Sequence, residues 1–345
     1  MRHESFASTA STCVFAAAAL LLMSGHASGQ SAEDRFEVPR QADGRPDLSG
    51  VWANNAATPL QRPAQLADKE TFTDEELAEL QETAERLFGG ADDASFGDGV
   101  FLAVLADVEK NVSGDGATGN YSSVWMVDRV FENRTSLITD PPNGRLPALT
   151  PEAEERQTAA RQQRGANPYA GPEDLGLQVR CITYGIPRIG GLGAGYNSYY
   201  QIFQTSDHVV MLGEMIHDAR VIPITDAPHI DGDIRQWHGD ARGHWEGDTL
   251  VVETTNFDEK ATYMGSTDGR HLVERLTRVG PDALRYEITV TDPTVWTSPW
   301  TAMIPMSRSD DPVFEYACHE GNIGMAGILA GARVQEIRPT DGGAR

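Results

Sequence analysis

Short apolar stretches separated by turn residues fill the second half of the chain, and this pattern constrains the fold more than any other feature. Leu272–Val279 and Leu284–Val290 flank the turn Gly280-Pro281-Asp282 and predict a β-hairpin. A run of hairpins without intervening helices is typical of an antiparallel barrel or sandwich. We favour a mainly β fold in which an antiparallel meander closes into a barrel, because closure leaves a cavity for a small ligand. Further strands are predicted at 200–204, 209–213, 220–224, 249–257, 300–307 and 313–318.

The organisation of the chain changes near residue 175. Residues 1–29 are a predicted signal peptide, residues 30–174 an N-terminal extension with a first strand and two helices, and residues 175–345 the antiparallel β domain.

In the extension, residues 46–52 lead into a first short strand. An amphipathic helix follows at Thr73–Phe88, where Thr73 and Glu76 are expected to form a capping box. A second helix is predicted from Thr150 to Arg164, and the chain between the helices is predicted to form loops.

An apolar run near the N-terminus indicates export. Val14–Met23 has the length of a signal-peptide core, and the small residues Ala27 and Gly29 predict cleavage before Gln30. The run is too short to span a bilayer, so we favour a removed leader over a retained membrane anchor. We therefore expect a periplasmic or secreted protein.

Two cysteines, Cys181 and Cys318, remain after removal of this leader. In an oxidising compartment two distant cysteines predict one disulfide, which would stabilise the fold by roughly 2–5 kcal/mol. The alternative is a nucleophilic Cys318 beside His319. We favour the disulfide, because adjacent residues of a strand point to opposite faces and cannot pair as thiolate and base.

The negative charge of the chain excludes several classes of function. With a formal net charge of −23 and an isoelectric point near 4.7, the sequence shows no basic patch for nucleic acid or anionic membranes. It has no Gly-x-Ser-x-Gly elbow and no phosphate-binding loop, and no strand-turn-helix unit surrounds the glycine-rich stretch Gly190–Tyr196. We therefore expect a small-molecule ligand, no nucleic-acid partner and no organic cofactor.

The segment Trp237–Asp248 combines two His, three carboxylates, one Arg and two Trp before a predicted strand. Titratable groups among aromatics that exclude water are typical of acid/base catalysis or of a metal site. A polar hairpin rim is the structural alternative. A turn at Gly239 or Gly243 would gather side chains around a divalent metal. The predicted metal ligands are His238, Asp240, His244 and Glu246.

A second set of residues is predicted to carry the acid/base chemistry. If the chain bends after the strand at 209–213, His217 can act as a base, with Asp218 orienting it and Arg220 binding an oxyanion or carboxylate. The alternative is an ion pair between Asp218 and Arg220 that fixes the bend. His319 and Glu320 follow the last predicted strand and can supply the complementary acid, or else cap a turn.

Aromatic side chains are the main predicted ligand contacts. Trp237 and Trp245 can form a stacking wall for an aromatic or sugar ligand, although packing in the core or at the rim is the commoner role of Trp. The full predicted set is Tyr196, Tyr200, Trp237, Trp245 and Asn256.

Several strings resemble those of a family of exported bacterial hypothetical proteins, and they cover most of the chain after the leader. They are 44–52, which contains DLSGVW, 136–145, 185–188, 245–252, which reads WEGDTLVV, and 316–322, which reads YACHEGN. The resemblance implies no activity. The Gly50-x-Trp52 opening followed by a β-meander is also similar to lipocalin-like barrels, which implies a cavity for an apolar or amphipathic molecule.

Taken together, these features predict an exported enzyme that performs acid/base chemistry of the lyase, hydratase or isomerase type on a small, partly apolar molecule. The first alternative is a periplasmic binding or carrier protein that holds the molecule unchanged. The second is a hydrolase that depends on a divalent metal at the His238–Glu246 segment.

Overall fold

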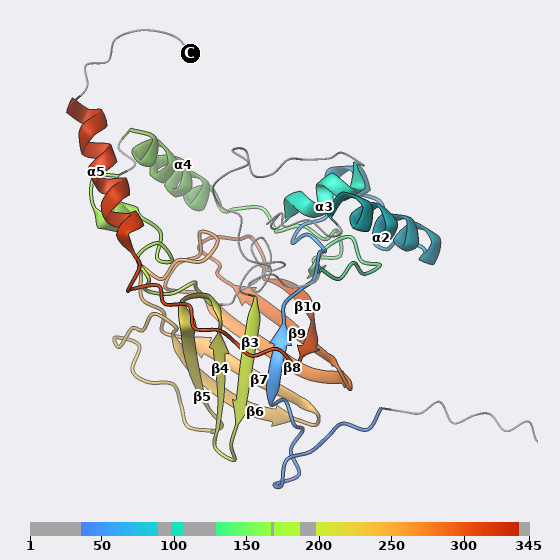
Figure 1. Cartoon of the computed structure of the whole chain (residues 1–345). Coiled ribbons are helices and arrows are strands. Elements are labelled where there is room, and N and C mark those ends of the chain that lie inside the picture. The colour runs from blue at the N-terminus through green and yellow to red at the C-terminus, as the bar shows by residue number, and fades with distance from the viewer. Residues whose placement is uncertain (1–35, 89–97, 107–128, 167–168, 187–197, 338–345) are drawn as a thin grey trace, which may run out of the picture. The chain divides into compact units, whose positions relative to one another are not determined.

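The structure is a computed structural model that describes residues 36–88, 98–106, 129–166, 169–186 and 198–337 (Figure 1). The predicted signal peptide, its cleavage site before Gln30 and the predicted ligand contact Tyr196 lie outside the described residues.

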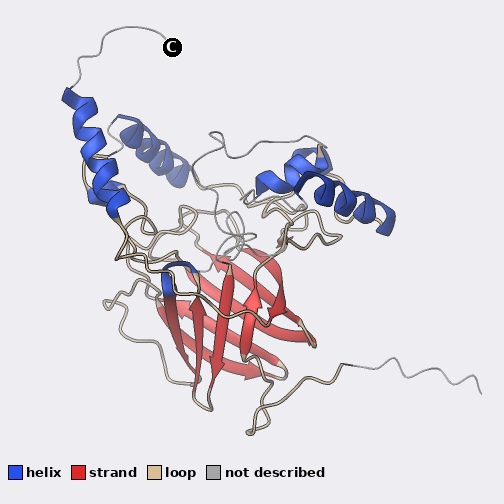
Figure 2. Cartoon of the chain, in the orientation of Figure 1, coloured by secondary structure: helices blue, strands red, loops and turns tan. Residues whose placement is uncertain are grey.

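Ten antiparallel strands of the described residues form a nearly closed barrel, which confirms the predicted mainly β fold (Figure 2). Their order is β5-β4-β3-β1-β10-β9-β8-β7-β6, and β2 pairs with β10 beside this path. The strands are β1 Gly50–Ala53, β2 Ile138–Asp140, β3 Tyr199–Gln204, β4 His208–Gly213, β5 Asp218–Pro223, β6 Asp240–Glu246, β7 Thr249–Thr255, β8 His271–Gly280, β9 Ala283–Thr291 and β10 Trp300–Ser309.

The edge strands β5 and β6 approach each other where the barrel comes closest to closing. Ile224 forms a parallel bridge with Gly243, and the backbone N–H of Thr225 donates to the carbonyl of Gly243 at 3.0 Å. A Cβ atom at position 243 would lie 2.8 Å from Ile224 Cδ1, so a side chain there would push the two edges apart.

The first strand of the chain is an internal part of this barrel. β1 lies between β3 and β10, with Trp52 opposite Tyr200 on one side and Arg308 on the other. The short strand predicted in the N-terminal extension therefore joins strands that come from the C-terminal half.

Side chains alternate between the barrel interior and its surface along the long strands, as hairpins with one buried face require. Leu272 of β8, Ile288 of β9 and Trp300 of β10 have no exposed surface. Trp300 packs edge-on against Trp296 with 5.6 Å between ring centroids. Each such side chain stabilises the fold by roughly 1.5–3 kcal/mol relative to exposure, so the interior of the barrel is the main source of stability.

Trp52 and Arg278 fill the barrel toward the end formed by the tight β8–β9 turn. The indole N–H of Trp52 donates to the carbonyl of Leu48 at 2.8 Å, and the guanidinium carbon of Arg278 lies 5.6 Å from the Trp52 ring centroid. Arg278 also donates to the carbonyls of Asp47 and Pro281. This end of the barrel is closed by packed side chains, and the opposite end carries the connections at 214–217, 256–270 and 292–299.

The helices of the described residues are α2 Asp74–Phe88, α3 Asp98–Leu105, α4 Pro151–Ala166 and α5 Ile323–Ile337. The predicted capping box opens α2: Thr73 N donates to Glu76 Oε2 at 2.9 Å, and Glu76 N donates to Thr73 Oγ1 at 3.3 Å. α4 begins after Thr150, whose hydroxyl accepts from Ala153 N at 3.2 Å. None of these helices is both long enough and apolar enough to cross a membrane.

A small apolar cluster holds α2 and α3 together. Phe101 has no exposed surface and stacks at 6.4 Å from Phe131, while Phe72 lies 6.3 Å from it on another side. Leu80 and Ala84 of α2 complete this cluster, which is separate from the barrel core.

The predicted strand at 313–318 is wrong. Residues 313–318 form no strand, and Ile323–Ile337 is the helix α5. β10 already pairs with β1 and β9, so the sheet offers no free place beside it for a further strand. Asn322 Oδ1 accepts from Met325 N at 3.3 Å and caps the helix, which overcomes the low helix propensity of its glycines.

The predicted disulfide between Cys181 and Cys318 is present, with 5.7 Å between the two Cα atoms. Cys318 is therefore not a free nucleophile. The bond ties the chain before β3 to the segment that precedes α5, and Asn322 adds a hydrogen bond to the carbonyl of Val179 at 2.8 Å. α5 has no buried residue, and polar contacts add to these links: Arg333 donates to the carbonyls of Ala170 and Tyr169 at 3.0 and 2.7 Å.

Reduction of this disulfide is expected to release the C-terminal segment rather than to unfold the barrel. The segment contributes no buried helix side chain, so its detachment costs little packing energy. The released chain also gains the conformational entropy that the bond had removed. Limited proteolysis with and without reductant should show faster cleavage between residues 312 and 337. The barrel should stay folded at room temperature with its Tm lowered by several degrees, because the bond closes a loop that contains β3–β10. The double variant Cys181→Ser with Cys318→Ser should behave like the reduced protein, and a collapse of the barrel Tm would contradict this picture.

Candidate functional site

A pocket lies at the end of the barrel that carries the β4–β5 connection at 214–217. It contains about 460 Å³ of space free of protein atoms, including its open mouth. Most of its wall is aromatic or apolar, with a few polar groups, as is typical of small-molecule sites. The lining residues are Tyr184, Gly185, Ile186, Tyr200, Met211, Gly213, Met215, Asp218, Arg220, His238 and Tyr286.

The deepest polar group of the pocket is a buried ion pair between Arg220 of β5 and Glu274 of β8. Arg220 Nη1 donates to Glu274 Oε1 at 2.9 Å, and Nη2 donates to Glu274 Oε2 and Thr254 Oγ1, each at 2.5 Å. The hydroxyl of Tyr286 donates to the same carboxylate. Glu274 and Thr254 have no exposed surface, and Arg220 and Tyr286 satisfy both oxygens of the carboxylate. The buried Nε of Arg220 has no hydrogen-bond partner among the described residues.

The pKa values of this group keep Arg220 charged and Tyr286 protonated. Burial raises the pKa of Tyr286 well above its ordinary value, and the negative charge of Glu274 raises it further. Burial alone would lower the pKa of Arg220, but the charge and hydrogen bonds of Glu274 offset this and the pKa is raised. The cationic Arg220 is thus neutralised by Glu274, and Tyr286 acts as a hydrogen-bond donor.

A second polar group, Thr183, Asp218 and His238, lies beside this ion pair. Thr183 Oγ1 donates to Asp218 Oδ2 at 2.7 Å, and His238 Nε2 lies 2.9 Å from Asp218 Oδ2 and 3.0 Å from Thr183 Oγ1. Since the Thr183 hydroxyl proton is directed at Asp218, the contact between Thr183 and His238 requires that Nε2 carry a proton and donate. The neutral ring therefore has its basic nitrogen at Nδ1, which has no hydrogen-bond partner among the described residues.

The connection between β4 and β5 positions Asp218 through a strained turn. Ile216 and His217 adopt φ angles of 67° and 55°, in the left-handed region that a β-branched residue such as Ile rarely occupies. The turn is held by hydrogen bonds from Glu214 N to the carbonyl of Tyr199 and from His217 N to the carbonyl of Glu214. After this turn β5 starts at Asp218, and the period of two along the strand directs both Asp218 and Arg220 to the pocket.

Gly239 fixes the backbone next to His238. Its φ is +67°, and a Cβ atom at this position would lie 2.5 Å from the carbonyl oxygen of Thr255 and 2.9 Å from Phe257 Cε1. Only glycine combines this conformation with such close approach, so the loop that carries His238 can pack directly against the end of β7.

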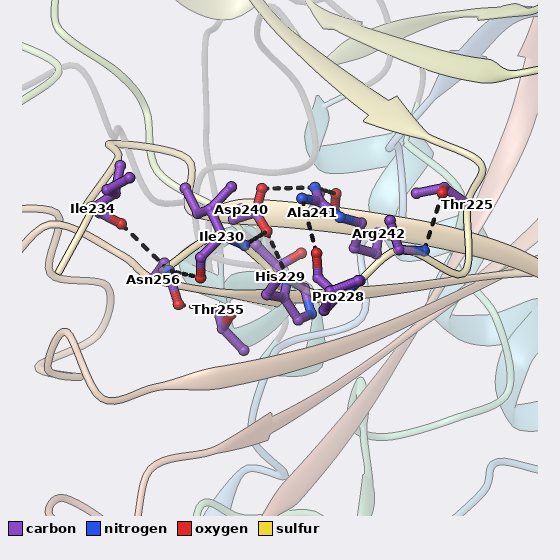
Figure 3. A network of polar contacts seen from close by, with 12 residues as sticks. Thr225, Pro228, His229, Ile230, Ile234, Asp240, Ala241, Arg242, Thr255 and Asn256 are labelled. Atoms are coloured by element: carbon purple, nitrogen blue, oxygen red, sulfur yellow. Dashed lines mark hydrogen bonds and ion pairs between the residues drawn. The ribbon is translucent and has the colours of Figure 1, made fainter. Parts of the chain in front are cut away.

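The loop before β6 is anchored by a network around Asp240 that Figure 3 shows from close by. Asp240 Oδ2 accepts from His229 Nδ1 at 2.7 Å and from Ile230 N at 3.2 Å, while Oδ1 accepts from Arg242 at 2.7 Å. Asn256, predicted as a ligand contact, donates instead to the carbonyls of Ile230, Asp231 and Ile234. Its amide holds the loop and does not line the pocket.

The structure brings four predicted site residues together at the pocket: Tyr200, Asp218, Arg220 and His238. His217, predicted as the base, is exposed and does not line the pocket, because the bend in the chain directs it outward. Asp218 is instead paired with His238, and Arg220 is paired with Glu274 rather than with Asp218.

The other predicted catalytic and stacking residues lie away from the pocket. His319 and Glu320 are exposed in the turn before α5, so their predicted place at the end of a strand is wrong. Trp237 is 36 % exposed, and Trp245 is half-buried against the barrel core. Neither Trp lines the pocket.

The predicted metal quartet does not converge. β6 runs straight through Gly243, at about 3.3 Å per residue, so the ends of the segment lie far apart. His238 contacts Asp218, Asp240 contacts His229 and Arg242, and the exposed pair His244 and Glu246 lies at the far end of β6. Within the described residues no group of three or more His, Cys, Asp or Glu is placed to hold a metal ion.

Sequence reasoning missed three important residues of the site, Thr183, Glu274 and Tyr286. A signal existed for Glu274, because it interrupts the apolar face formed by Leu272 and Leu276 on β8, where a charge requires a partner. No local pattern marked Thr183, whose role depends on contacts with β5 and the loop before β6.

A scan against protein-family models, a search of curated proteins and a search of solved structures each found no match to this chain.

Replacing Glu274 by Gln is expected to destabilise the fold by about 3–5 kcal/mol, because the charge of Arg220 would stay buried without its partner. The exposed Glu253→Gln on the neighbouring strand β7 is the matched control and should change stability by less than about 0.5 kcal/mol. Urea unfolding of both variants measures the difference. Equal stabilities would show that the pair does not constrain the barrel.

Tyr286 is expected to make folding stability fall at alkaline pH. Its folded-state pKa is raised, so its contribution is complete below the pKa of an unfolded tyrosine and is lost as the pH rises above about 10. Between these pKa values the loss approaches about 1.4 kcal/mol per pH unit for one proton. Urea unfolding from neutral to alkaline pH should show a shallower decline for Tyr286→Phe than for the wild type. Identical slopes would contradict the raised pKa.

Proposed function

We propose that this protein binds a small, partly apolar molecule in the barrel pocket and transfers a proton on it through His238. The observation that carries the proposal is the contact of His238 Nε2 with Asp218 Oδ2 at 2.9 Å in the wall of an otherwise mainly apolar pocket. The reaction class is that of a lyase, hydratase or isomerase, which needs proton transfer and no organic cofactor.

The arrangement supports a defined role for each side chain. The basic Nδ1 of His238 accepts a proton from the ligand, and the carboxylate of Asp218 stabilises the imidazolium that forms. Thr183 Oγ1 donates to Asp218 and accepts a hydrogen bond from Gly185 N at 3.0 Å. Because it also contacts His238 Nε2, it fixes the positions of the carboxylate and the imidazole ring. Asp218 and Thr183 act as positioning residues.

The wall of the pocket supports a ligand with a substantial apolar part. Tyr184, Ile186, Met211 and Met215 line it, and Met side chains adapt readily to ligand shape. Tyr286 and Arg220 add polar groups to the lining, and the charge of Arg220 is neutralised by Glu274. The strained backbone at Ile216 and His217 lies beside this wall, and such strain concentrates at functional sites.

The neutralised charge of Arg220 also favours a second function, that of a carrier that holds its ligand unchanged. The charge of Arg220 is neutralised by two hydrogen bonds to Glu274, so no free cation is available there for an oxyanion that develops during a reaction. A compound recovered chemically unaltered after long incubation with the protein would support the carrier.

We further propose export to the periplasm or beyond. The predicted leader supports this, and the disulfide between Cys181 and Cys318 fits an oxidising compartment.

The test begins with native mass spectrometry of the protein purified from its own host, which identifies compounds that remain bound. Turnover of the recovered compound or its close analogues is then followed for the wild type and for His238→Gln. We expect turnover to fall by about 10²–10⁴-fold with the fold and ligand affinity retained.

His217→Gln is the matched control, because this histidine lies nearby in the chain but is exposed and outside the pocket. It should leave turnover unchanged. Full activity in His238→Gln, or an equal loss in His217→Gln, would reject the assigned role of His238.

A further inference from the structure

A wide groove adjoins the pocket at its Tyr184 and Gly185 wall, and both residues line both spaces. α4, the segment 173–185 and the β7–β8 connection form the rest of the groove. It extends to Thr183, whose hydroxyl contacts Asp218 and His238. A ligand in the pocket can therefore extend past the proposed catalytic group into the groove.

The groove presents cations that the chain does not neutralise. Arg164, Arg180 and Lys260 line it, and none of the three has an ion-pair partner among the described residues. This is unexpected in a sequence with 51 Asp and Glu against 28 Lys and Arg, where carboxylates are available to pair with every cation.

Five cations and four carboxylates line the groove, so its lining carries a net positive formal charge. Glu173, Asp174, Glu259 and Asp268 also line it. Asp174 accepts from Gly171 N at 2.8 Å, and Asp268 lies 3.8 Å from Arg235, outside the groove lining. Arg156 and Arg161, the other two cations of the lining, donate to the carbonyl of Thr294 and to Thr158 Oγ1. Arg164, Arg180 and Lys260 are thus left to receive an anionic group from a ligand.

We infer that the groove is a subsite for a carboxylate, and that the ligand of the barrel pocket is an amphipathic carboxylic acid. Its apolar part occupies the pocket, and its carboxylate lies in the groove near Arg164, Arg180 and Lys260. Arg in particular matches the planar geometry of a carboxylate with two parallel hydrogen bonds. This inference rests on the proposed function, because it requires that the pocket bind the apolar part.

The test compares two probes of equal chain length, decanoate and the neutral decanol, by isothermal titration calorimetry with the full-length protein. We expect decanoate to bind about tenfold more tightly than decanol, as the sum of a few partly exposed charge contacts. Added salt should weaken the binding of decanoate and leave that of decanol unchanged.

Arg180→Gln combined with Lys260→Gln should remove most of the preference for decanoate, while decanol binds as before. Arg285→Gln is the matched control, because this Arg lies on β9, outside the lining of both spaces, and pairs with Glu287. It should retain the preference.

Two outcomes would overturn the inference, and they can be told apart. Equal binding of both probes by the wild type would reject the carboxylate subsite and leave the apolar pocket of the proposed function intact. Failure of both probes to bind would reject the subsite and also count against the proposed function.

Discussion

The buried pair of Arg220 and Glu274 constrains the candidate site more than any other interaction. Two opposite charges inside the barrel require one another, since each alone would face a large desolvation penalty. Their contact joins β5, an edge strand of the sheet, to β8 across the interior of the barrel. β5 is therefore held in one register, and Asp218, two residues before Arg220, is brought to the pocket wall. The proton-transferring group that we propose thus depends on a pair that does not itself face the reaction.

Two independent anchors bring His238 to Asp218. The loop before β6 is tied to Asp240 and Asn256 by hydrogen bonds, and Gly239 lets it pack against the end of β7. On the other side the strained turn at Ile216 delivers the start of β5. A histidine and an aspartate twenty residues apart in the sequence are held in contact in this way.

The barrel was predictable, whereas the partners within the site were not. Hairpins such as β8 and β9 carry a period of two and a turn signal, which are local properties of the sequence. Asp218 and Arg220 were recognised as chemically important, but the sequence pointed to a bend at His217 and could not show on which side of the chain that histidine would lie. The pairing of Asp218 with His238 depends on how two connections meet at the end of the barrel. The helix α5 was missed because its glycines resemble a loop, and only its capping by Asn322 and the filled sheet make the helix evident.

The position of β1 has a consequence for how the molecule assembles. This four-residue strand inserts between β3 and β10 and joins the three-stranded group β3-β4-β5 to the rest of the sheet. Its register pairs Val51 with Ser309, near the two ends of the described chain. The sheet therefore cannot be completed before β10 has been synthesised, because β1 needs it as a partner. Such long-range pairing raises the contact order and slows folding, so insertion of β1 is a late step in the assembly of the barrel.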